Sequence, residues 1–166
     1  MTLTPEFVAD CPYGPGGLLL DALLEVDRDA SRVRVRMPTH DDLPLTREQR
    51  VHEVRHPRHV SGGLMVHMTG MVGFVHAYHV LDLRHHEGWI GYGGRIHQAK
   101  FRALARPGVP LEITCTATRV RRGQARIVAR YDFRFEQAGT LVYEGDQTAM
   151  WLKIDESAPR PEDSDD

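Results

Sequence analysis

Apolar and polar positions along the chain predict one long helix near its middle. Between residues 62 and 83, apolar side chains recur at helical spacing, and nearly every face of the segment is apolar. Such a helix is expected to be buried on more than one side. Residues 32–37 alternate strictly between arginine and an apolar residue, which predicts a half-buried strand. Residues 18–26 form an apolar run that fits either a strand or a short helix.

Four further strands are predicted after the helix. Apolar stretches at residues 89–101, 111–120, 125–135 and 141–154 are separated by turn segments that each contain glycine. Two short elements, one long helix and four strands are typical of an α+β fold in which an antiparallel β-sheet wraps around one long central helix. A single helix does not cover such a sheet, so we expect a homodimer or a higher oligomer.

The composition is that of an ordinary globular protein. A chain of 166 residues, 41% hydrophobic and 27% charged, predicts a single domain over residues 1–155, followed by an acidic, disordered tail over residues 156–166. The net charge of −2 argues against a nucleic-acid partner. No apolar run reaches the roughly 18 residues of a membrane span. Two distant cysteines without an export signal favour a cytoplasmic location.

Candidate chemistry gathers where a histidine-bearing loop meets the predicted helix. The chain turns through Ser61, Gly62 and Gly63, and His67 follows one helical turn later. A helix start leaves backbone N–H groups unpaired, with the positive end of the helix dipole behind them, which suits a polarised carbonyl or an anion. Histidine titrates near neutral pH without perturbation. The segment therefore predicts an acid–base site.

The motifs along the chain resemble the hot-dog fold and, within it, the β-hydroxyacyl-ACP dehydratases. The resemblance covers roughly residues 12–152. Residues 12–26 are similar to that family's opening strand, and residues 99–108 are similar to its Lys-Phe-Arg-Arg-Pro-Val-x-Pro-Gly segment. Residues 52–57 keep the family's His-to-Pro spacing before the helix, and residues 61–67 match the following segment after one inserted residue.

The resemblance implies reversible dehydration of 3-hydroxyacyl thioesters that are carried by an acyl carrier protein or by CoA, with no further cofactor and no metal. His52 or His56 would remove the α proton. His67 stands where the family has its catalytic glutamate or aspartate, and would replace that acid. The amides of Gly62 and Gly63 would polarise the thioester carbonyl.

Several assignments stay open at this point. An ungapped match places Glu53, rather than His52, at the position of the family's histidine. Ser61 stands where the family has proline, and we count it with His59 among the substrate-binding candidates. Gly93, in a glycine-rich part of the next predicted strand, would either permit close approach of an acyl-pantetheine arm or mark a β-bulge.

Two other functions fit the same residues. Hydrolysis of thioesters is the first, because Ser61-Gly62-Gly63 half-matches the His-Gly-Gly motif of hot-dog thioesterases, with Thr69 or Gly70 near the place of the acid. A non-catalytic acyl-binding or structural subunit is the second.

A zinc peptidase is a weaker interpretation of the same loop. Residues 52–56 spell His-Glu-x-x-His, a pattern that binds zinc only when both imidazoles lie on one face of a helix. Pro57 biases His56 away from helical geometry, so we expect no metal site there.

Overall fold

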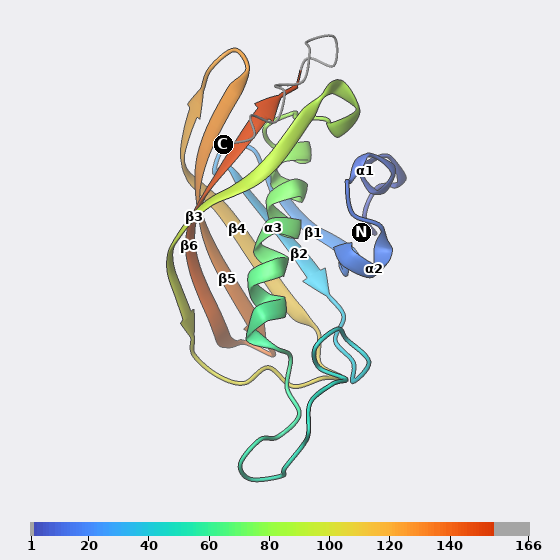
Figure 1. Ribbon diagram of the computed structural model, residues 1–166. Helices are drawn as coiled ribbons and strands as arrows, with labels where there is room; N and C mark the ends of the chain where they lie inside the picture. The colour runs from blue at the N-terminus through green and yellow to red at the C-terminus, as the bar shows by residue number, and fades with distance from the viewer. Residues whose placement is uncertain (1, 155–166) are drawn as a thin grey trace, which may run out of the picture.

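A six-stranded antiparallel β-sheet and one long helix form the body of the protein (Figure 1). The computed structural model describes residues 2–154, and the predicted acidic tail lies outside them. The strands are β1 (Ala22–Asp27), β2 (Arg32–Met37), β3 (Trp89–Phe101), β4 (Leu111–Arg122), β5 (Arg126–Gln137) and β6 (Thr140–Lys153). The helices are α1 (Pro5–Asp10), α2 (Pro15–Leu18), α3 (Gly62–His79) and the short 3-10 helix η1 (His85–Glu87).

The strand order in the sheet is β1-β2-β4-β5-β6-β3, and every neighbouring pair is antiparallel. β4, β5 and β6 follow one another through short turns, whereas β3 crosses to the far edge and pairs with β6. The sheet curves around α3, with α1 and α2 beyond the β1 side (Figure 1). The predicted α+β arrangement around one central helix is therefore confirmed.

Element boundaries differ from the predictions by more than two residues at two places. The first strand begins at Ala22 because Leu18 closes α2 and Leu19 takes a left-handed backbone conformation with φ of 55°. α3 ends at His79 rather than near residue 83. The backbone leaves the helix just beyond Val80, and Asp82 adopts a φ of 59° while its carboxylate accepts hydrogen bonds from Arg28.

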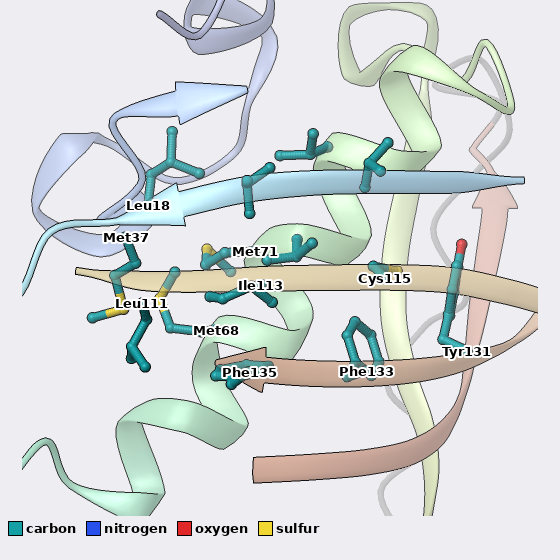
Figure 2. Packing of buried hydrophobic residues seen from close by; sticks show 14 of the residues in the cluster. Leu18, Met37, Met68, Met71, Leu111, Ile113, Cys115, Tyr131, Phe133 and Phe135 are labelled. Atoms are coloured by element: carbon teal, nitrogen blue, oxygen red, sulfur yellow. The ribbon is translucent and has the colours of Figure 1, made fainter. Parts of the chain in front are cut away.

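The core lies between α3 and the concave face of the sheet. Met68 and Met71 of α3 pack among buried side chains of β2, β4 and β5 (Figure 2). The arginine–apolar alternation of β2 predicts its faces correctly, since Val33, Val35 and Met37 are fully buried while the intervening arginines face outward. Burial of α3 against this face contributes hydrophobic stabilisation to the fold.

His76 near the end of α3 is fully buried and hydrogen-bonded at both ring nitrogens. Its Nε2 lies 3.0 Å from the carbonyl oxygen of Ser31, in the turn between β1 and β2, and therefore donates to it. The Tyr131 hydroxyl, 3.2 Å from Nδ1, then donates to that nitrogen. Burial lowers the pKa of His76 to about 4, so the imidazole is neutral near pH 7.

This buried histidine predicts a loss of stability in mild acid. Between about pH 6.5 and pH 4 the unfolded chain binds a proton at His76 while the folded chain does not. The free energy of unfolding should therefore fall by about 1.4 kcal/mol for each unit by which the pH is lowered, or by about 3 kcal/mol over the window. Urea unfolding across the window measures this slope.

The control is a His76→Gln variant, which retains hydrogen-bonding groups but does not titrate. Its stability should depend less steeply on pH than that of the natural chain. Equal slopes in the two proteins would show that His76 does not carry the acid sensitivity.

Candidate functional site

A cavity of about 440 Å³ lies between α3 and the β3–β6 side of the sheet. It is lined by α3 from Val66 to Phe74, by β3, β5 and β6, and by Tyr13 in the N-terminal segment. This volume is within the range of small-molecule sites, which are mostly apolar with a few polar groups that fix the ligand's orientation. The polar groups of this cavity include those of His67, Thr69 and Gln147.

His67 is half-buried in the cavity wall, and a backbone contact fixes its ring. Its Nε2 lies 2.7 Å from the carbonyl oxygen of Gly17, which can only accept, so Nε2 carries the proton and donates. In the neutral ring Nδ1 then keeps its lone pair. The Tyr13 ring packs edge-on against the imidazole, with centroids 5.6 Å apart. The N-terminal segment therefore fixes the orientation of this imidazole.

Thr69 and Gln147 form a neutral polar spot in the same wall. The Thr69 hydroxyl is buried, 2.7 Å from the carbonyl oxygen of Val66 and 3.0 Å from the Gln147 carboxamide. The Gln147 carboxamide also lies 3.4 Å from the Tyr143 hydroxyl. Because the Thr69 hydroxyl has a single proton, it donates to one partner at a time. This spot can hydrogen-bond a carbonyl oxygen or a water molecule.

Among the described residues that line the cavity there is no aspartate or glutamate. Arg95 is the one lining residue with a permanent charge, and His67 is the one imidazole. The cavity lining thus holds one imidazole without the carboxyl partner found in an acid–base pair.

His52, Glu53 and His56 lie on an exposed loop between β2 and α3, outside the cavity lining. The backbones of His52 and His56 exchange two hydrogen bonds of 2.9 Å, which close a tight hairpin. The Nδ1 of His52 accepts from the amides of Val54 and Arg55. These residues are not helical, so the His-Glu-x-x-His string lacks the helix that a zinc peptidase site requires.

The loop histidines and the start of α3 do not meet His67 in the cavity. Ser61 caps α3 by accepting from the Gly63 amide at 3.3 Å, and a Cβ at Gly62 would meet the Phe101 ring at 2.7 Å. His59 Nδ1 lies 2.8 Å from the Pro57 carbonyl oxygen. The cavity lining begins one turn further along, at Val66. The roles assigned to Ser61, Gly62, Gly63 and His59 from the sequence, and to the exposed loop histidines, stay predictions.

Gly93 does line the cavity, together with residues that the sequence reasoning missed. Gln147 and Trp151 are cavity residues on β6, and Tyr13 is one from the N-terminal segment. The sequence of β6 does contain a signal for Gln147. Every second residue from Tyr143 to Trp151 is apolar, aromatic or glycine except Gln147, whose amide interrupts the series. Tyr13 carries no comparable signal, because only the folded chain brings it beside α3.

Two general features of the described residues bear on the site. No helix within residues 2–154 is long and apolar enough to cross a bilayer. In the same part of the chain, no three His, Cys, Asp or Glu side chains converge as a metal site would require.

Solved structures with the same architecture include thioesterases. A putative thioesterase from Ralstonia eutropha, a phenylacetic acid degradation-related protein, is 19% identical with a TM-score of 0.60, over 87% of this chain and 95% of its own. A mutant thioesterase from Pseudomonas aeruginosa is 18% identical with a TM-score of 0.60, over 92% and 97% of the two chains. A thioesterase from Haemophilus influenzae is 18% identical with a TM-score of 0.59, over 95% and 97%.

These likenesses show that the chain has the hot-dog fold. No protein-family model and no curated protein matches the sequence. The dehydratase resemblance of the sequence finds no support among these three neighbours, each of which is described as a thioesterase.

The packing around Trp151 predicts that alanine substitutions at Gly91 and Gly93 change the stability of the protein by different amounts. A Cβ at Gly91 would meet the indole ring of Trp151 at 2.4 Å, whereas a Cβ at Gly93 meets nothing within 4 Å. Because Trp151 is buried, Gly91→Ala should destabilise the protein by about 1–3 kcal/mol through overpacking. Gly93→Ala, two residues along the same strand, should leave stability within about 0.5 kcal/mol of the natural chain. Urea midpoints of the two variants measure the contrast, and equal values would contradict this placement of Trp151.

Proposed function

We propose that this protein hydrolyses acyl thioesters in the cavity between α3 and β3–β6. The observation that carries the proposal is His67, a single oriented imidazole with an available Nδ1, in a ligand-sized cavity whose lining has no carboxylate. Hydrolysis needs one group that takes a proton and later returns it, which an imidazole can do near neutral pH. The named activity of the structural neighbours supports the same class of reaction.

In this reaction His67 acts as general base toward water. Nδ1 accepts a proton as the water oxygen bonds to the thioester carbonyl carbon, and the Gly17 carbonyl stabilises the imidazolium through Nε2–H. The tetrahedral intermediate then collapses and the C–S bond breaks. The imidazolium returns its proton to the departing thiolate. One water is consumed, and a carboxylic acid and a free thiol leave.

The neutral polar spot at Thr69 and Gln147 would bind the carbonyl oxygen. Hydroxyl and amide donors beside this oxygen stabilise the negative charge that develops on it. The thiol part would be CoA or the phosphopantetheine arm of a carrier protein, and it would leave the cavity past Gly94 and Arg95 of β3. No cofactor enters the proposed chemistry, because water is the only co-reactant.

Dehydration of a 3-hydroxyacyl thioester is the alternative. Dehydration requires removal of the α proton and delivery of a proton to the departing hydroxyl. The resemblance to the dehydratases implies that a histidine and a carboxyl group share this task. Only the histidine is available in the cavity lining. Release of free thiol distinguishes hydrolysis from dehydration, which yields an enoyl thioester and no thiol.

We further propose that the functional unit is a homodimer joined through β3. Among the described strands β3 pairs only with β6, so a 13-residue edge stays open. Ile96, which lines the cavity, is 50% exposed, and Phe101, whose ring packs 5.2 Å from buried Tyr143, is 56% exposed. An open edge flanked by exposed apolar side chains invites pairing with another strand. A second copy would cover both features and border the cavity.

The catalytic proposal predicts that His67→Ala and His67→Gln lower kcat/KM for thiol release by about 100-fold or more, because the general base is lost. A colorimetric thiol assay with acyl-CoA substrates measures this. The control is His40→Ala, which removes an exposed histidine outside the cavity. Full turnover in His67→Ala, or enoyl formation without thiol release in the natural protein, would reject the proposal.

The dimer proposal predicts twice the chain mass in solution. Ile96→Glu places a charge beside the open edge and should shift the mass toward that of one chain. Val54→Glu is the matched control, because Val54 is 85% exposed between His52 and His56, in a loop that belongs to no strand of the sheet. Light scattering after gel filtration gives the masses. A natural chain that is monomeric at micromolar concentration would contradict the proposal.

A further inference from the structure

Three glycines in the cavity wall leave space that side chains could occupy. Gly70 and Gly73 lie on α3, and Gly93 lies on β3. All three line the cavity, and a Cβ added at any of them would meet nothing within 4 Å. None of them has a backbone conformation that requires glycine. Gly73 is buried, whereas Gly70 and Gly93 are exposed, so the open space beside these two is accessible to solvent. None of the three glycines is required by a turn.

Two of these glycines weaken the helix that holds the fold together. Gly70 and Gly73 lie in the interior of the 18-residue α3, where alanine is more favourable than glycine because it loses less backbone freedom on folding. Gly73 is also buried, so a methyl group there would fill empty space. Stability alone would favour alanine at both positions. The glycines are explained if a ligand occupies the space beside them.

The rest of the wall is aromatic. Six of the twelve Phe, Tyr and Trp residues of the chain line this cavity: Tyr13, Phe74, Tyr92, Tyr131, Phe133 and Trp151. Phe74 meets Trp151 edge to face, with centroids 5.4 Å apart and planes at 78°, and Tyr13 lies 5.9 Å from Phe74. Aromatic rings prefer such edge-to-face neighbours, and a ring-bearing ligand would extend the series.

We infer that Gly70, Gly73 and Gly93 are specificity-determining residues that keep room for the acyl group of the substrate, and that this acyl group carries an aromatic ring. The inference rests on the proposed function only in taking the ligand to be an acyl thioester. It concerns which acyl group binds, and not how the thioester bond is broken.

Binding of inert analogues tests this independently of turnover. In the analogues a methylene group separates the carbonyl from the sulfur of CoA, so no hydrolysis can occur. The acyl part is a phenylacetyl, an octanoyl or an acetyl group. Calorimetric titration of the natural protein should give tightest binding for the phenylacetyl analogue. Equal or tighter binding of the octanoyl analogue would overturn the aromatic part of the inference.

Variants that fill the space test the glycines. Gly73→Val should weaken binding of the phenylacetyl analogue about 10-fold or more, while binding of the acetyl analogue changes by less than about threefold. Gly93→Val should act in the same direction. The matched control is Gly14→Ala, where the new Cβ also meets nothing within 4 Å but lies outside the cavity lining. Unchanged affinity for the phenylacetyl analogue in Gly73→Val and Gly93→Val would overturn the role of the glycines.

Thermal unfolding separates a filled cavity from a damaged fold. Gly70→Ala and Gly73→Ala should each raise Tm by about 2–4 °C, because they remove a helix-interior glycine without a clash. A fall in Tm would show that the space is needed for packing and would overturn the inference.

If the natural protein binds the phenylacetyl analogue with the expected selectivity but releases no thiol from the true thioester, the proposed hydrolysis fails while the specificity assignment stands.

Discussion

The packing of α3 into the concave face of the sheet is the interaction on which the rest of the structure depends. On the side of β2 and β4, large side chains such as Met68 fill the interface. On the side of β3 and β6 the interface is incomplete, because the helix presents glycine at positions 70 and 73. The same helix therefore holds the fold together on one side and bounds a cavity on the other.

Two histidines of α3 show how this asymmetry separates structural from chemical roles. His76 faces the filled side, is fully buried, and uses both ring nitrogens for hydrogen bonds to Ser31 and Tyr131. Burial lowers its pKa to about 4, so it is neutral at ordinary pH. His67 faces the cavity and has one nitrogen held by the Gly17 carbonyl. Residue type alone does not distinguish His67 from His76. The face of the helix on which each histidine lies distinguishes them.

Much of the fold could be predicted from local patterns. The alternation in β2, the helical spacing of α3 and the glycine turns between the later strands each reflect a periodicity that burial imposes on the sequence. Local patterns do not reveal whether a loop histidine lies beside His67. The course of the long segment before α3 depends on non-local contacts, such as those between Gln49 and His59. The Thr69–Gln147 contact joins α3 to β6 across 78 positions of sequence, and no local pattern encodes it.

The central claim is that the cavity between α3 and β3–β6 binds an acyl thioester with its carbonyl beside His67. A crystal structure of the protein with an inert acyl-CoA analogue tests this most directly. The account predicts the acyl group in the cavity beside Gly73 and the analogue's carbonyl within about 4 Å of His67 or of the Thr69 hydroxyl. An analogue bound at the histidine loop around residues 52–59, with the cavity unchanged, would contradict it.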